Sequence, residues 1–426
     1  MATKNKKPQL VFMPHYIGSL KYFERLSPFL EIKYEILFFP ILPIQYADTR
    51  FYKEMIQYCE SKGIKIFKRS EFKPASFLKY IPGYALLKQA ELFKNDLKLF
   101  FENKNIQKIV AVNDTGFPLD YFFLQARKKG IETMVLQWAL ISPGQDSAPH
   151  KQSSRIRILA HRFKRAMSIF LKRKLLEVVM REKLDIVKHF VGNGSAERFG
   201  VINKKNFDYL KLRGIPEEKM SIVGYLDFYT AEKVKRELYT DTVLKKEIAK
   251  KYSINTNKKN IILFTSPYNT KEVTILDDQA QCAYFKDILD TVREILPPDD
   301  FDLSVKIHPA ENINTYEPLI KEGVKIHVIA DNSELIGLSD LYLAESTTVN
   351  FIPIIMSKDC IFTNFLNLSL VELTKESFAI KKFITDKEEF KNLLVSFKEG
   401  NLPRQYVSDK DIFTTDSLKK ILEWIG

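Results

Sequence analysis

The chain has 426 residues, a formal net charge of +13 and a hydrophobic content of 45%. Its length predicts two sizeable domains or one two-lobed enzyme, and the hydrophobic content is normal for a globular protein. It lacks a run of about 20 apolar residues that could span a membrane. Its start, MATKNKKPQLVFMP, has no signal-peptide core, so we expect a cytoplasmic protein. The three cysteines, Cys59, Cys282 and Cys360, are too widely spaced for a disulfide framework or a zinc site. The positive charge predicts an anionic partner: nucleic acid, a phosphorylated substrate or an anionic membrane.

The first part of the chain alternates strand-like apolar runs with amphipathic helical segments, the pattern of a parallel sheet covered by helices. Helical segments such as FYKEMIQYCESKG and LDYFFLQARKKG end at a glycine, a common helix terminator. The expected strands are Gln9–Pro14, Tyr34–Phe39, Ile64–Lys68, Lys108–Val112 and Glu132–Trp138.

Residues Lys151–Lys183 interrupt this alternation with eleven Lys or Arg against two Glu. From about residue 155, apolar residues recur at helical spacing while most of the basic residues fall on other faces, which predicts a basic amphipathic helix. Such a helix could dock on anionic lipid through its Lys and Arg. The alternative is a helix whose apolar face packs on the first lobe and whose charges are solvated.

A second alternation begins near Asn260 with NIILFTSPYN and continues through FDLSVKIHP, VKIHVIA, LYLAEST and CIFTNF. The charged stretch before it, EKVKRELYTDTVLKKEIAKKYSINTNKKN, is interpreted as an interdomain connection. The predicted fold is therefore α/β, with two Rossmann-like doubly wound lobes, residues 1–240 and 241–426, facing a central cleft.

Parallel sheets bind ligands beyond the carboxyl ends of their strands, so the residues just after each apolar run are the candidate ligand contacts. Ser346, Thr347 and Thr348 could present hydroxyl and backbone N–H groups to a phosphate at a helix start, or one of them could simply cap that helix. His308 could donate to a phosphate oxygen, although a histidine beside a strand is often structural. The candidates in the second lobe are Ser266, Tyr268, His308, Pro309, Glu345, Ser346, Thr347 and Thr348.

The pairing of KIHP with a later EST, preceded by LFTSPYN and EEKMSIVGYLDFY, resembles bacterial glycosyltransferases of the two-lobed GT-B class. The similar groups build capsule and surface polysaccharides, and include bacterial sialyltransferases, Kdo transferases and CDP-glycerol transferases. In those enzymes a His-Pro and a Ser/Thr pair hold the ribose and phosphate of the nucleotide. The resemblance implies donor-binding roles for His308, Ser346 and Thr347 above all, and places Gly224 of IVGYLDF on the donor side.

The same resemblance extends to VAVNDTGFPLDYFFLQARKKGIETMVLQWAL in the first lobe, where such enzymes place an acidic residue and a glycine. Asp114 and Gly116 match in kind, which implies that Asp114 is a general base for an inverting transfer. The alternative is that Asp114 caps the following helix. The later strand ends in Gln137-Trp138 where the pattern has Gln-His, and both residues are assigned to the acceptor side. His15, after the first strand, could contact the leaving phosphate or the acceptor, or could cap the first helix.

The function implied is metal-independent transfer of a sugar from a nucleotide donor to a surface glycan or glycolipid acceptor, with a CMP-activated acidic sugar favoured over a UDP-sugar. No cofactor is expected, because the sequence has no DxD triplet at a strand end, no GxGxxG and no Walker loop. The alternatives are a UDP-GlcNAc 2-epimerase-like enzyme of the same fold, or a UDP-sugar or CDP-glycerol transferase. Nucleic-acid binding is disfavoured, because the basic segment lacks the interleaved aromatic residues that stack on bases.

Overall fold

The computed structural model describes residues 7–41, 49–70, 84–102, 105–138, 170–182, 191–270, 273–368, 371–407, 412–414 and 416–426. The chain forms two compact units. Unit 1 comprises Met1–Ile141, Ser147–Val223 and Lys419–Gly426, and unit 2 comprises Ser142–Asp146 and Gly224–Leu418. The units divide after Val223, and the lobe boundary expected from the sequence lies after residue 240.

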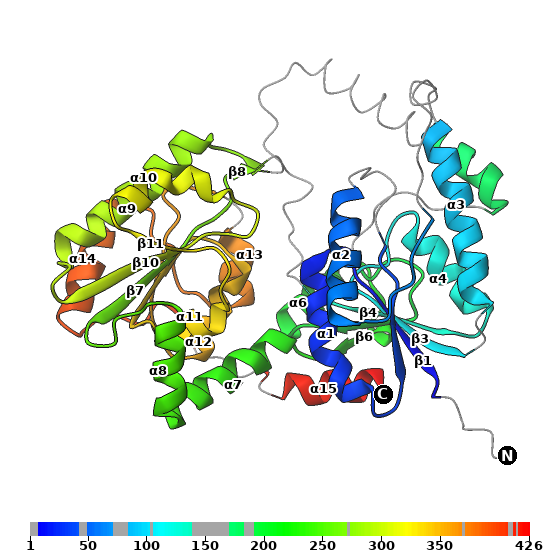
Figure 1. The fold of residues 1–426 in the computed structure, drawn as a ribbon, viewed down its shortest axis with the longest axis horizontal. Helices are drawn as coiled ribbons and strands as arrows, with labels where there is room; N and C mark the ends of the chain where they lie inside the picture. Colours follow the sequence, from blue (N-terminus) through cyan, green and yellow to red (C-terminus); the bar gives the residue numbers. More distant parts are fainter. Residues whose placement is uncertain are drawn as a thin grey trace. The chain divides into compact units, whose positions relative to one another are not determined.

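Unit 1 is built on a six-stranded parallel sheet of order β2-β1-β3-β4-β5-β6 (Figure 1). Its strands are β1 (Gln9–Met13), β2 (Glu35–Phe38), β3 (Ile106–Ala111), β4 (Glu132–Leu136), β5 (Arg198–Val201) and β6 (Met220–Ile222). Its helices are α1 (Ile17–Leu30), α2 (Thr49–Lys62), α3 (Tyr84–Phe101), α4 (Leu119–Lys128), α6 (Lys204–Leu212) and the 3₁₀ turn η3 (Glu217–Lys219).

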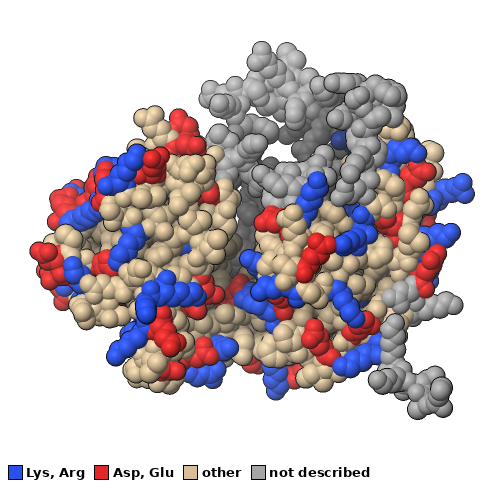
Figure 2. Space-filling model, viewed as in Figure 1, with Lys and Arg blue, Asp and Glu red and all other residues tan. Residues whose placement is uncertain are grey.

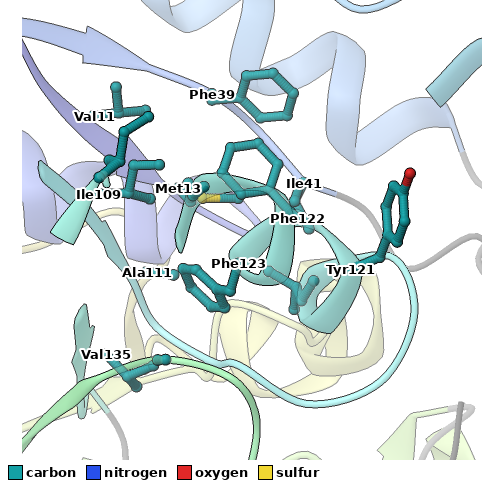
Figure 3. Packing of buried hydrophobic residues seen from close by; sticks show 14 of the residues in the cluster. Val11, Met13, Phe39, Ile41, Ile109, Ala111, Tyr121, Phe122, Phe123 and Val135 are labelled. Atoms are coloured by element: carbon teal, nitrogen blue, oxygen red, sulfur yellow. The ribbon is translucent and has the colours of Figure 1, made fainter. Parts of the chain in front are cut away.

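The core of unit 1 contains many phenylalanine side chains, which come mostly from the helices and from the segments that follow the strands. Figure 3 shows Phe39 and Phe122 beside Met13 and Ile41, with Phe122 coming from α4. The rings of Phe39 and Phe122 meet edge to face, with centroids 5.0 Å apart. This packing fixes β1, β3 and α4 against one another, and with them the loops at the carboxyl ends of these strands.

Unit 2 contains a five-stranded parallel sheet of order β11-β10-β7-β12-β13 and a small antiparallel hairpin, β8-β9 (Figure 1). Its strands are β7 (Lys259–Phe264), β8 (Asn269–Thr270), β9 (Val273–Thr274), β10 (Phe301–Lys306), β11 (Lys325–His327), β12 (Leu341–Ala344) and β13 (Asp359–Phe362). Its helices and 3₁₀ turns are α7 (Leu226–Thr240), α8 (Thr242–Lys251), α9 (Asp278–Ile295), η4 (Ile313–Tyr316), α10 (Glu317–Lys321), α11 (Asn332–Leu338), η5 (Thr348–Asn350), α12 (Phe351–Ile355), α13 (Val371–Ser377) and α14 (Lys387–Lys398).

The predicted fold class, two Rossmann-like doubly wound α/β units, is confirmed by these two sheets. The charged stretch interpreted as an interdomain connection instead forms α7 and α8 within unit 2. Leu238 of α7 packs against the backbone of Gly337 on α11, and Ile248 of α8 is also buried. The final helix, α15 (Ser417–Ile425), begins with two residues of unit 2 and continues as part of unit 1.

Most of the predicted basic helix lies outside the described residues. Its last part is described and is helical at residues 170–180. Leu176 and Met180 belong to the buried core of unit 1, while Phe170 and Val178 are 54% and 77% exposed. The described part therefore packs one side on unit 1, while its outer side carries apolar side chains together with the basic Lys172, Arg173 and Lys174.

Candidate active site

The carboxyl edge of the unit-2 sheet brings together the residues that the sequence placed on the donor side. Strands β10, β7 and β12 are neighbours, and they are followed by His308, Ser266 and Ser346 respectively. Because all three strands are parallel, these residues leave the sheet at the same edge. The sequence predicted that these residues lie at one edge of one sheet, and the strand order agrees with this.

His308 is held as a hydrogen-bond donor. The backbone N–H of Ala310 donates to His308 Nδ1 at 3.1 Å, so the neutral ring carries its proton on Nε2. Burial, reinforced by the charge of Lys306, lowers the pKa of His308 to about 4. The imidazole is therefore neutral near pH 7 and offers an Nε2–H group. Pro309, which follows it, is exposed.

Glu345, predicted from the sequence to contact the donor, forms hydrogen bonds inside unit 2. Its carboxylate accepts hydrogen bonds from the hydroxyls of Tyr268 and Tyr284, and its carbonyl accepts one from the Asn350 amide at 2.8 Å. The side chain is 1% exposed, and burial raises its pKa well above the ordinary value. The hydrogen bonds of Glu345 with Tyr268 and Asn350 therefore stabilise the loop after β12.

The hydroxyl residues after β12 stand at the start of a short 3₁₀ turn rather than of a long helix. Ser346 Oγ lies 2.9 Å from Thr374 Oγ1. Thr347 is the N-cap residue of η5 but its side chain makes no capping bond, and Thr348 is exposed. After β7, Ser266 Oγ is buried and has no hydrogen-bond partner among the described residues. A buried hydroxyl without a hydrogen-bond partner is suited to bind a polar ligand.

Gly224 has a structural reason to be glycine. Its φ is +84°, and a Cβ atom there would lie 2.2 Å from Ser417 Oγ. The serine hydroxyl accepts a hydrogen bond from the N–H of Tyr225 at 3.2 Å. Gly224 thus allows the chain to turn closely against the start of α15 as it enters α7.

On unit 1, the carboxyl end of β1 carries His15 and Tyr16, and that of β4 carries Gln137 and Trp138. Ser19 Oγ accepts from the N–H groups of His15 and Tyr16, at 2.9 and 3.2 Å, and so closes the start of α1. The rings of Tyr16 and Trp138 meet edge to face with centroids 4.9 Å apart. The Gln137 amide is buried, donates to Asn206 Oδ1 and accepts from a backbone N–H, so it ties β4 to the neighbouring loop.

Asp114 is completely buried after β3. Its Oδ1 accepts from the N–H of Gly192 at 2.7 Å, and its Oδ2 accepts from the N–H of Gly194 at 3.0 Å and from Lys219 Nζ at 3.3 Å. Burial raises its pKa against the lowering effect of Lys219 and the two backbone donors. These partners lie outside α4, whose N-cap residue is Pro118, so Asp114 anchors the loop at 192–194 and does not cap α4. Nearby, Gly116 takes a positive φ of +76°.

On the face shown in Figure 2, charged residues of both signs are mixed. Figure 2 shows Lys and Arg interspersed with Asp and Glu over the visible face, and many of them form ion pairs such as Lys286 with Glu322. Within the described ranges, His, Cys, Asp and Glu do not form a group of three or more that could hold a metal ion. In that same part of the chain, no helix combines the length and apolarity needed to cross a bilayer.

The fold is shared with solved structures. The chain is similar to UDP-GlcNAc 2-epimerase from Neisseria meningitidis, solved with UDP-GlcNAc (TM-score 0.58, 13% identity, covering 98% of this chain and 99% of that one). It is also similar to UDP-GlcNAc 2-epimerase from Methanocaldococcus jannaschii (TM-score 0.56, 14% identity, 98% and 99% covered). A third similar structure is the wall teichoic acid polymerase TagF (TM-score 0.54, 14% identity, 99% and 89% covered). No family model and no curated protein matches the sequence. These neighbours are enzymes with the GT-B type of fold, and at this identity the likeness establishes the fold.

Proposed function

We propose that this protein is an enzyme that binds a nucleoside-diphosphate-activated sugar at the carboxyl edge of the unit-2 sheet and breaks the bond between its anomeric carbon and the diphosphate. The observation that carries the proposal is the neutral His308, whose Nε2–H group is a donor at the end of β10. A leaving diphosphate gains negative charge as this bond breaks, and a fixed donor stabilises that charge. Ser266, Ser346 and Thr347 supply further hydroxyls at the ends of neighbouring strands.

The comparisons support a nucleoside diphosphate over the CMP-activated sugar favoured by the sequence. The Neisseria meningitidis structure is described as bound to UDP-GlcNAc, and a TagF structure as soaked with CDPG. We therefore place UDP first and CDP second as the nucleotide of this protein. A CDP-glycerol transferase would bind its nucleotide at the same edge.

Two reactions follow the breaking of this bond. In the first, the sugar passes to a glycan or glycolipid acceptor, as the resemblance of the KIHP and EST motifs implies. In the second, favoured by the coverage of the two epimerases, UDP-GlcNAc is epimerised at C2. Epimerisation at C2 breaks the C2–H bond, so an epimerase working in D₂O incorporates deuterium at C2 without any acceptor, whereas a transferase does not. Proton NMR of UDP-GlcNAc incubated with the protein in D₂O separates the two.

For a transferase, Asp114 is the base that the sequence suggests, and burial raises its pKa toward the range that suits a base. Both of its oxygens are engaged with the 192–194 loop and Lys219. A base role would require one of these bonds to open when the acceptor binds. We therefore propose the anchoring role first, with the base role as its tested alternative.

Nucleotide binding tests the proposal directly. Thermal shift and calorimetry with UDP, CDP and CMP should show stabilisation by UDP or CDP, amounting to about 2.7 kcal/mol at 100 times the dissociation constant. His308→Ala and Ser346→Ala should each weaken binding while the protein stays folded. Glu317→Ala, at an exposed residue of α10, is the matched control and should bind as the wild type does. Equal affinity in the wild type and in both site variants would remove the proposal.

A further inference from the structure

Glu311 lies in the turn that follows β10, three residues beyond His308, and its carboxylate receives hydrogen bonds from four elements of unit 2. The N–H of His308 donates to Oε2 at 2.6 Å, and the hydroxyl of Thr265, at the end of β7, donates to the same oxygen. The Tyr316 hydroxyl donates to Oε1 at 2.6 Å, and the Gln281 amide of α9 also donates to Oε1. Both oxygens are therefore fully used inside the protein.

These bonds join the residues that the candidate site depends on. Thr265 Oγ1 also accepts from the N–H of His308 at 3.0 Å, so one backbone N–H is shared between Thr265 and Glu311. Gln281 Nε2, which donates to Glu311, also donates to the carbonyl of Ser266 at 2.8 Å. The turn closes on itself, because the N–H of Glu311 donates to the carbonyl of His308 at 3.0 Å.

The orientation of the imidazole depends on this turn. His308 Nδ1 accepts from the N–H of Ala310, which lies between the two ends of the turn that Glu311 holds. If the turn loosens, Ala310 loses its place opposite Nδ1, and the ring is free to rotate and to exchange its tautomer. A carboxylate with saturated oxygens does not itself approach an anionic ligand.

We infer that Glu311 is a positioning residue, which acts by holding the 308–311 turn so that His308 presents Nε2–H to the diphosphate of the substrate. The inference rests on the proposed function for its ligand, but the state of the imidazole can be measured without any ligand. Glu311 lies two residues beyond the KIHP motif quoted from the sequence, yet its role depends on partners up to 46 residues away.

The experiment combines two variants with one control. Glu311→Ala removes the acceptor altogether, and Thr265→Val removes the shared hydroxyl with little change in shape. Glu317→Ala is the control, since Glu317 is an exposed glutamate nearby that pairs with Lys321. Each protein is labelled with ¹⁵N-histidine, and the His308 signals are identified by their absence in His308→Gln.

In the free wild-type protein at pH 7, His308 Nδ1 should show the chemical shift of an unprotonated nitrogen and Nε2 that of a protonated one. In Glu311→Ala and Thr265→Val both shifts should move toward each other, and UDP affinity measured by calorimetry should fall about tenfold, equivalent to about 1.4 kcal/mol. Glu317→Ala should change neither. A change in general stability alone would not shift the tautomer of one histidine.

The two proposals fail in distinguishable ways. Folded Glu311→Ala and Thr265→Val proteins whose His308 shifts match the wild type overturn the positioning role of Glu311, whatever UDP does. If the chemical shifts of His308 change but UDP affinity does not, the positioning role is supported. The part of the proposed function in which His308 binds the diphosphate is then contradicted.

Discussion

The pH dependence of folding stability tests the central feature of the candidate site, the neutral imidazole of His308. Burial and the nearby charge of Lys306 lower its pKa from 6.5 to about 4. The folded protein therefore keeps His308 neutral at pH values where the unfolded chain binds a proton. Because the unfolded chain then holds more protons, the free energy of unfolding falls as the pH is lowered from 6.5 towards 4.

The magnitude follows from the two pKa values. A pKa of 6.5 in the unfolded chain and about 4 in the folded protein corresponds to a loss of about 2 kcal/mol between pH 7 and pH 5. His308→Gln should lack this loss, because glutamine does not titrate. Urea unfolding of both proteins at pH 7, 6 and 5 measures the difference.

The comparison isolates His308 from other titrating groups. Burial also lowers the pKa of His327, but that contribution is present in both proteins and cancels in their difference. His327→Gln is the matched control and should retain the contribution of His308. If the free energies of unfolding of the wild type and His308→Gln stay parallel between pH 7 and pH 5, His308 titrates normally and the argument for a buried neutral donor fails.

Two further predictions concern unit 1. Asp114→Asn should lower the free energy of unfolding by about 1–3 kcal/mol, because an amide nitrogen would then face buried donors. A variant of unchanged stability whose turnover falls about 10²–10⁴-fold would instead identify Asp114 as the base. The helix at residues 170–180 should bind vesicles containing phosphatidylserine and be released by salt, since such attraction is screened within about 8 Å at physiological ionic strength. Binding is measured by co-sedimentation of the protein with the vesicles, and the triple variant Phe170→Ser, Lys172→Gln and Arg173→Gln should co-sediment less. A wild-type protein that does not co-sediment with the vesicles refutes lipid docking.

The central strands of the sheets were predictable because they are largely buried and appear as apolar runs. The runs that became β1, β7, β10 and β12 were all identified. Strand β5 was missed because Arg198–Val201 is only four residues long and contains an arginine and a glycine. Residues Ile64–Lys68 were expected as a strand, but they form only a single bridge, between Ile66 and Phe38.

Side-chain partners were much harder to predict than strands. Asp114 was recognised as a strand-end acid, but its donors are Gly192 and Gly194, 78 and 80 residues further along the chain. Glu345 was expected among the donor-binding residues, yet two tyrosine hydroxyls fill its oxygens. Sequence position places a residue at an edge of a sheet, whereas the direction of its side chain depends on neighbours that only the folded chain brings close.

The acids at the edge of unit 2 bear on the proposal that this edge binds the diphosphate of a nucleotide sugar. Burial raises the pKa of Glu345 well above its ordinary value and also raises that of Glu311, which favours the uncharged carboxyl groups. The oxygens of Glu345 are filled by tyrosine hydroxyls, and those of Glu311 by four donors. The ammonium group of Lys306 donates hydrogen bonds to the carbonyls of Ile307 and Val328, so the lysine does not extend from the edge. Its charge still contributes to lowering the pKa of His308. At the end of β10, His308 is a neutral imidazole with its proton on Nε2. A neutral donor can bind a phosphate oxygen without a proton transfer, as the proposed function requires.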